Sequence, residues 1–193
     1  MLQIILILTL AYLLGSIPFS LIIARLLKGI DIRNHGSGNI GATNVLRTVG
    51  KREAALALIA DILKGALPVL LAVFILEGVW ITATAVLVVL GHVFPIFASF
   101  KGGKGVATSL GALIVIVPEG VIISLILWFL VLAVFRYASL ASILAAIALP
   151  AICWGLTSPL AYTAAASINA VIIILRHTEN IKRLIAGTES KVF

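Results

Sequence analysis

The sequence predicts an all-α integral membrane protein with about seven transmembrane helices, its N-terminus outside and its C-terminus cytoplasmic. Composition is the first observation that supports this fold class. Of the 193 residues, 62% are hydrophobic and 11% are charged, whereas a soluble domain carries roughly 25% charged residues. A compact domain of this size still exposes about a third of its chain's surface. Lipid must therefore cover the apolar surplus.

The second observation is the spacing of the apolar runs. A helix that crosses the hydrocarbon core needs about 20 apolar residues. Such runs place spans near residues 3–24, 54–76, 79–98, 106–117, 121–135, 138–155 and 159–175. The fourth run is too short to cross unaided, so its helix begins inside the preceding KGGKG segment or that segment dips below the headgroups. A single transmembrane domain, residues 1–193, holds all of these runs.

The third observation is the one-sided distribution of basic residues. Of the 14 lysines and arginines, all but Lys64 fall in segments that this topology places at one face. The turns at the opposite face, residues 77–78, 118–120 and 157–159, contain none. The positive-inside rule makes the basic face cytoplasmic. The net charge of +7 thus reflects topology and attraction to anionic phosphates, and we expect no nucleic-acid partner.

The first cytoplasmic segment, residues 28–53, is a long loop with closely spaced glycines. Residues without a Cβ let backbone N–H groups converge on an anion. The neutral and charged donors that accompany the glycines are Ser37, Asn39, Thr43, Asn44 and Arg47. A flexible surface loop is the alternative interpretation, but the density of donors favours phosphate binding.

The second cytoplasmic segment carries Lys101 and Lys104 on either side of Gly102 and Gly103, just before an apolar helix. A glycine-rich loop at a helix N-terminus suits an anion, and a lysine adds a point charge for phosphate. Alternatively, the lysines anchor the helix end by reaching toward the headgroups. That alternative would not require glycines, which weaken a helix.

The third cytoplasmic segment follows the last span. His177 and Asn180 stand three residues apart and share a face if this segment is helical. The segment is either an amphipathic basic helix on anionic lipid or a site for a second anionic ligand or an acid/base group. Inside the second span, Asp61 and Lys64 are either functional or a structural pair. Adjacent phosphate sites at one face indicate two phosphorylated substrates, or one substrate with a phosphate leaving group.

Three strings, GSGNIGATNVLRTVGK, HVFPIFASFKGGKGVAT and RHTENIKRLIAGTESK, closely resemble the cytoplasmic motifs of one family. These are the bacterial membrane-integral glycerol-3-phosphate acyltransferases that use acyl phosphate. The resemblance implies acyl transfer to the 1-hydroxyl of glycerol 3-phosphate, which gives lysophosphatidic acid and inorganic phosphate. It also implies a multi-pass protein of the bacterial cytoplasmic membrane with its active site facing the cytoplasm.

The resemblance implies acyl phosphate, glycerol 3-phosphate and membrane lipid as partners, with no cofactor and no metal. Whether the soluble enzyme that produces acyl phosphate docks on the chain is left open. The implied catalytic residues are Lys104, His177 and Ser37. The implied substrate-binding residues are Gly38, Asn39, Gly41, Thr43, Asn44, Arg47, Lys101, Gly102, Gly103, Ser142 and Asn180. The general base is either His177 or the phosphate of the donor.

The sequence lacks the features of three other classes of protein. The H-x-x-x-x-D pair of the acyltransferases with soluble donors is absent, as are a nucleophile elbow and a reactive cysteine. A transporter of a phosphorylated metabolite would place its site at the midplane within an inverted repeat, which the sequence does not show. A CDP-alcohol type phosphatidyltransferase would need several aspartates within the spans, and Asp61 is the only one there.

Overall fold

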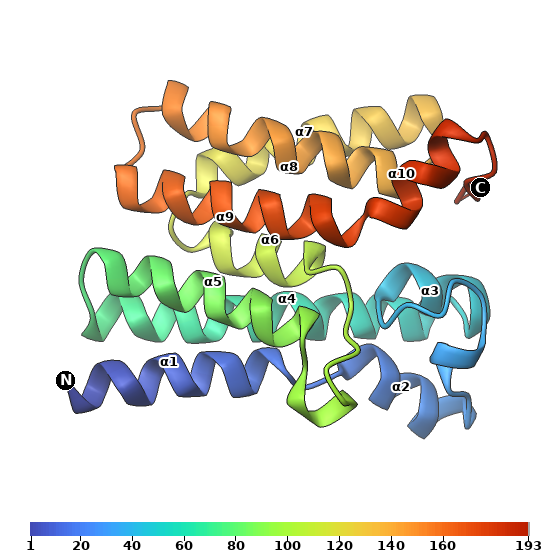
Figure 1. The fold of residues 1–193 in the computed structure, drawn as a ribbon, viewed down its shortest axis with the longest axis horizontal. Coiled ribbons are helices and arrows are strands. Elements are labelled where there is room, and N and C mark those ends of the chain that lie inside the picture. Colours follow the sequence, from blue (N-terminus) through green and yellow to red (C-terminus); the bar gives the residue numbers. More distant parts are fainter. Residues whose placement is uncertain (193) are drawn as a thin grey trace.

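The computed structural model describes residues 1–192, and that part of the chain is all-helical (Figure 1). Two short 3-10 turns, η1 (Ile32–Asn34) and η2 (Ile96–Ala98), interrupt the loops. The helices are α1 (Leu2–Gly15), α2 (Phe19–Lys28), α3 (Ala42–Thr48), α4 (Lys51–Ile75), α5 (Val79–Val93), α6 (Val106–Ile114), α7 (Pro118–Phe135), α8 (Ala138–Gly155), α9 (Leu160–Arg176) and α10 (Thr178–Ile185).

The long helices run side by side, with the N- and C-termini at opposite ends of the bundle (Figure 1). Helices α1, α4 and α5 form one part, α7, α8 and α9 form the other, and the short α6 lies between them (Figure 1). The short helices α2, α3 and α10 gather at the end that carries the C-terminus (Figure 1). That end holds the polar loops.

The helical membrane fold is confirmed, but the number of full spans differs from the prediction. Within residues 1–192, four segments are long and apolar enough to cross: α4, α5 extended to Ala98, α7 and α8. Counting the bent pairs α1–α2 (40°) and α9–α10 (58°) as spans gives up to six. The predicted fourth span, 106–117, is represented by α6, which has 9 residues. It is too short to cross by itself.

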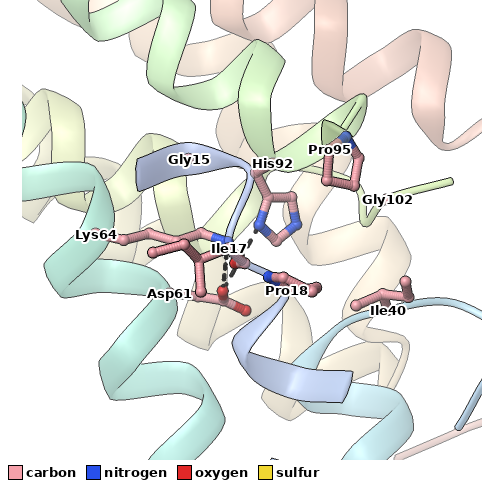
Figure 2. A pocket seen from close by; sticks show the side chains of 9 residues that line it. All are labelled: Gly15, Ile17, Pro18, Ile40, Asp61, Lys64, His92, Pro95 and Gly102. Carbon is pink, nitrogen blue, oxygen red and sulfur yellow. Dashed lines mark hydrogen bonds and ion pairs between the residues drawn. The ribbon is translucent and has the colours of Figure 1, made fainter. Parts of the chain in front are cut away.

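The predicted first span, 3–24, is broken between Gly15 and Phe19. Pro18 has no N–H and disfavours helical backbone at Ile17. The freed Ile17 carbonyl accepts a hydrogen bond of 2.8 Å from Lys64 Nζ of α4 (Figure 2). Inside a membrane such a carbonyl needs a protein partner, because water is absent. The hydrogen bond from α4 therefore stabilises the break between α1 and α2.

Asp61 balances the charge of Lys64 at this break. Its Oδ1 lies 2.9 Å from Lys64 Nζ, and both side chains are buried (Figure 2). Ser20 of α2 donates to Asp61 Oδ2 over 3.2 Å, and His92 Nδ1 of α5 lies 3.7 Å from Oδ1. Thr108 Oγ1 of α6 lies 3.0 Å from the same His92 nitrogen. This cluster joins α2, α4, α5 and α6, which favours the structural interpretation of the Asp61–Lys64 pair.

Glycines bring two pairs of helices into close contact. A Cβ at Gly111 would lie 1.9 Å from the Ile62 carbonyl oxygen, and one at Gly65 would lie 2.1 Å from the carbonyl oxygen of Thr108. Both contacts join α4 to α6. Gly15 and Gly91 make the equivalent contacts between α1 and α5. Small residues let membrane helices approach closely and gain van der Waals contact. The close backbone contacts with α4 therefore fix the position of α6.

We expect Gly111→Ala to destabilise the protein, because the new methyl group would force α6 away from α4. Overpacking of this kind typically costs about 1–3 kcal/mol. The apparent thermal midpoint in detergent should fall by several degrees. Gly155→Ala is the matched control, since a Cβ at that helix end meets nothing within 4 Å. Equal midpoints for the two variants would contradict the close α4–α6 contact.

Candidate functional site

A cavity of about 770 Å³ opens between the two parts of the bundle. Its polar lining comes from the loop before α3, α3 itself, the KGGKG turn, the start of α8, α10 and the C-terminal tail. Its apolar lining comes from α4, α6, α7 and α8, with Leu58, Leu110, Leu125 and Leu149 among the residues. Along α8 the lining extends from Ser139 to Leu149, which is about 15 Å at helical rise. The cavity thus has a polar head and an apolar groove.

The glycine-rich loop is ordered around the side chain of Asn44. The amide nitrogen lies within hydrogen-bond distance of the carbonyls of Ile32 (2.9 Å), His35 (3.1 Å) and Asn39 (3.1 Å). Its Oδ1 accepts from the N–H of Ser37 over 3.0 Å. A Cβ at Gly36, where φ is 59°, would lie 2.3 Å from this oxygen. Asn44 therefore orders the loop, while Ser37, Asn39 and Thr43 face the cavity.

The KGGKG turn rests on the end of α5. The N–H of Gly103 donates to the His92 carbonyl over 3.1 Å. A Cβ at Gly102 would lie 2.1 Å from that carbonyl oxygen, and one at Gly103 would lie 2.1 Å from His92 Nε2. These glycines let the turn lie flat on α5. The turn directs Lys104 and the N-terminus of α6 to the cavity, whereas Lys101 is exposed.

The ammonium group of Lys104 is held by a chain of polar side chains. It donates to Asn180 Oδ1, and Asn180 Nδ2 donates to Glu189 Oε1 over 2.7 Å. Glu189 also accepts from Ser139 Oγ (2.8 Å) and from Arg183 Nε (2.7 Å). Burial lowers the pKa of Lys104 to about 8, with Glu189 opposing the shift and Arg183 adding to it. An anion entering the site would favour the charged ammonium.

Glu189 reaches the site because the chain reverses after α10. Gly187 has a φ of 68°. Its N–H donates to Leu184 O, and the N–H of Thr188 donates to Arg183 O over 2.9 Å, which is the Schellman pattern. Burial by itself raises the pKa of Glu189, but hydrogen bonds from Asn180, Arg183 and Ser139 outweigh it and lower the pKa. Glu189 is ionised in the site.

His177 lies at the junction of α9 and α10 and is buried. Its Nδ1 lies 2.7 Å from the Ile173 carbonyl, so Nδ1 carries the proton and Nε2 has the free lone pair. Burial and, next, the charge of Lys104 lower the pKa of His177 to about 4. The imidazole is therefore neutral near pH 7, and Nε2 is a hydrogen-bond acceptor.

Most of the predicted site residues come together around this cavity. They are Ser37, Asn39, Gly41, Thr43, Asn44, Arg47, Lys104, Ser142, His177 and Asn180. Within residues 1–192, the lining of this cavity does not include the other four predicted residues, which are Gly38, Lys101, Gly102 and Gly103. Gly38 shapes the loop with a φ of 68°. Arg47 contacts the tail by donating to the Ser190 carbonyl over 3.0 Å.

Sequence reasoning missed Glu189, Ser139 and Trp128, which also line the cavity. Glu189 could have been found from its position two residues after Gly187, which follows the basic end of a helix. Ser139 and Trp128 lie at helix positions with no pattern that separates them from ordinary membrane residues.

Comparison with known proteins identifies the family. The protein-family model described as Glycerol-3-phosphate acyltransferase matches residues 5–187 of this chain. Glycerol-3-phosphate acyltransferase of Geotalea daltonii is 48% identical over 181 residues, covering 93% of each chain. The crystal structure of PlsY (YgiH), an integral membrane glycerol 3-phosphate acyltransferase in its glycerol 3-phosphate form, is also similar. It has a TM-score of 0.95 and 42% identity, and the match covers 98% of this chain and 95% of that one. The lysophosphatidic acid form has a TM-score of 0.92 and 41% identity, with the same coverage. This chain belongs to the membrane-integral glycerol-3-phosphate acyltransferase family.

Proposed function

We propose that this glycerol-3-phosphate acyltransferase takes its acyl group from acyl phosphate. The acyl group goes to the 1-hydroxyl of glycerol 3-phosphate, and the products are lysophosphatidic acid and inorganic phosphate. The observation that carries the proposal is one cavity that joins a cationic polar head to an apolar groove. Both substrates carry phosphate, and one carries an acyl chain. A transporter would instead need polar groups near the bilayer midplane.

The proposed step is a direct displacement. The 1-hydroxyl oxygen of glycerol 3-phosphate attacks the carbonyl carbon of acyl phosphate. A new C–O ester bond forms, and the bond from that carbon to the phosphate oxygen breaks. Acyl phosphate is a mixed anhydride with a good leaving group, so positioning can supply much of the catalysis, about 7–11 kcal/mol.

The proton of the 1-hydroxyl goes to the phosphate of the donor, and the pKa of His177 supports this assignment. At about 4, this pKa makes the imidazole a weak base near neutral pH. Phosphate groups bind their second proton near pH 6, so the phosphate of the donor is the better acceptor. The Nε2 lone pair of His177 instead orients a donor group of glycerol 3-phosphate.

We propose that two groups of residues in the polar head bind the two substrates. Ser37, Asn39 and the glycine loop hold the phosphate of the donor together with Lys104. Arg47, Ser142, His177 and Asn180 hold glycerol 3-phosphate. The acyl chain lies in the apolar groove between α4, α6, α7 and α8.

We further propose a topology with the cavity head at the cytoplasmic face. The N- and C-termini lie at opposite ends of the bundle (Figure 1), as an odd number of crossings requires. The fourth crossing combines the KGGKG segment, α6 and residues 115–117, which connect α6 to α7. The basic loops lie at the C-terminal end, which supports a cytoplasmic position by the positive-inside rule.

The donor is tested with purified protein, glycerol 3-phosphate and either acyl phosphate or acyl-CoA. We expect lysophosphatidic acid from acyl phosphate alone, with activity retained in chelator. Among residues 1–192, no three His, Cys, Asp or Glu side chains form a group that could hold a metal ion. Robust turnover of acyl-CoA without acyl phosphate would overturn the proposed donor, while the family assignment would stand.

Lys104→Ala should lower kcat/KM roughly 30- to 1,000-fold, equivalent to about 2–4 kcal/mol. The ammonium faces the phosphate that departs with negative charge, so its contribution grows toward the transition state and kcat should fall. Lys182→Ala is the control, because that exposed lysine pairs with Glu179 on α10. A well-folded Lys104→Ala enzyme that keeps more than about half of the wild-type kcat/KM would remove Lys104 from the site.

The pH profile gives a second readout of the same variant series. As pH rises through about 8, the pKa of Lys104, the free enzyme loses this positive charge and substrate binding should weaken. Lys104→Arg stays charged throughout this range and should lose the inflection, even if its activity is lower. A wild-type inflection that persists in Lys104→Arg would belong to another group.

The topology is tested with single cysteines in a Cys153→Ala background. Cysteines at Lys28, Lys101 and Lys191 should be shielded from a membrane-impermeant thiol reagent in intact cells and should react after permeabilisation. A cysteine at Glu119, which is exposed at the start of α7, should react in intact cells. Labelling of position 101 from outside would reverse the proposed orientation.

A further inference from the structure

The indole of Trp128 on α7 donates a hydrogen bond to a predicted substrate-binding residue on α8. Trp128 Nε1 lies 3.0 Å from Ser142 Oγ, and both residues line the cavity. Ser142 is buried, at 8% exposure. Ser142 Oγ also donates to the Ala138 carbonyl over 2.8 Å. These contacts hold the hydroxyl group in place beside the cavity.

The hydrogen bonds that remain available to Ser142 Oγ follow from the number that a hydroxyl group can donate and accept. A hydroxyl group has one O–H donor and two acceptor lone pairs. The indole N–H can donate and cannot accept, so it occupies one lone pair of Ser142. In the structure the O–H donates to the Ala138 carbonyl. One lone pair remains for a ligand in the cavity, so Ser142 is arranged to accept a hydrogen bond from that ligand.

A lone pair presented to the cavity is a poor partner for phosphate oxygens, which are also acceptors. It suits a hydroxyl group. The 1-hydroxyl of glycerol 3-phosphate gives up its proton during acyl transfer, so it cannot keep donating to Ser142 through the reaction. The neighbouring 2-hydroxyl keeps its proton.

We propose that Ser142 accepts a hydrogen bond from the 2-hydroxyl of glycerol 3-phosphate and that Trp128 is the positioning residue that makes Ser142 an acceptor. This inference rests on the proposed function. The pair gives the site a preference for substrates with a 2-hydroxyl, because an analogue without that group leaves the lone pair of Ser142 unmatched in a buried site.

The test compares glycerol 3-phosphate with 3-hydroxypropyl phosphate, which has the phosphate and the primary hydroxyl but lacks the 2-hydroxyl. The enzymes are wild type, Trp128→Phe, Ser142→Ala and the double variant, each assayed with acyl phosphate. Phenylalanine keeps an aromatic ring in the wall of the cavity and removes the N–H. Trp154→Phe is the matched control, since that tryptophan is 71% exposed on α8.

In wild type and Trp154→Phe we expect kcat/KM to favour glycerol 3-phosphate. Trp128→Phe and Ser142→Ala should each reduce this preference roughly three- to tenfold, the size of one net hydrogen bond. The loss should fall on glycerol 3-phosphate, with kcat/KM for the analogue and KM for acyl phosphate nearly unchanged. The double variant should be no less selective than Ser142→Ala, because the indole acts through that hydroxyl.

Two results would overturn the inference. If Trp128→Phe impairs both acceptors equally, the indole is a packing residue. If the two substitutions multiply in the double variant, Trp128 does not act through Ser142. Should Trp128→Phe fail to fold, an unchanged preference in Ser142→Ala would be decisive against the proposal. A wild type that gives no product from acyl phosphate would refute the proposed function instead, so the two failures are distinguishable.

Discussion

The buried pair of Asp61 and Lys64 is the interaction on which the cavity end of this fold depends. Pro18 breaks the first span, and inside a membrane the Ile17 carbonyl needs donors from the protein. Lys64 supplies the donor and Asp61 supplies the balancing charge. Removal of either partner would leave an uncompensated buried charge, typically at a cost of about 3–5 kcal/mol. The bend of α1–α2, and with it the start of the glycine-rich loop, is thus anchored to α4.

The same cluster reaches the KGGKG turn through His92. Its imidazole contacts Thr108 and lies near Asp61, and its backbone carbonyl binds the N–H of Gly103. Close glycine contacts hold α6 against α4. Lys104 and the first turn of α6 are therefore held in place before any substrate arrives. In the proposed reaction, such preorganisation would make electrostatic stabilisation of the departing phosphate effective.

The C-terminal tail completes the polar head. Glu189 enters a site rich in cations and accepts from Asn180, Ser139 and Arg183. It aligns Asn180, whose amide oxygen accepts from Lys104. One carboxylate thereby orients the group that holds the ammonium, and it offsets part of the repulsion among Lys104, Arg47 and Arg183. In the proposed function, the remaining positive charge binds the substrate phosphates.

The sequence by itself determined the membrane class, the approximate helix limits and most of the polar head, because composition, apolar run length and glycine-spaced motifs are local signals. Lys104, His177 and Asn180 could be predicted together because they lie in polar segments that resemble the motifs of the family. The tertiary structure alone decided that Glu189 turns back to meet Ser139 and that α6 is a short helix at the centre. It also decided that Trp128 of α7 meets Ser142 of α8 beside the groove. Lipid is as apolar as a protein core, so residues that line the groove and residues that face the bilayer look alike in sequence. They differ only in which helices become neighbours.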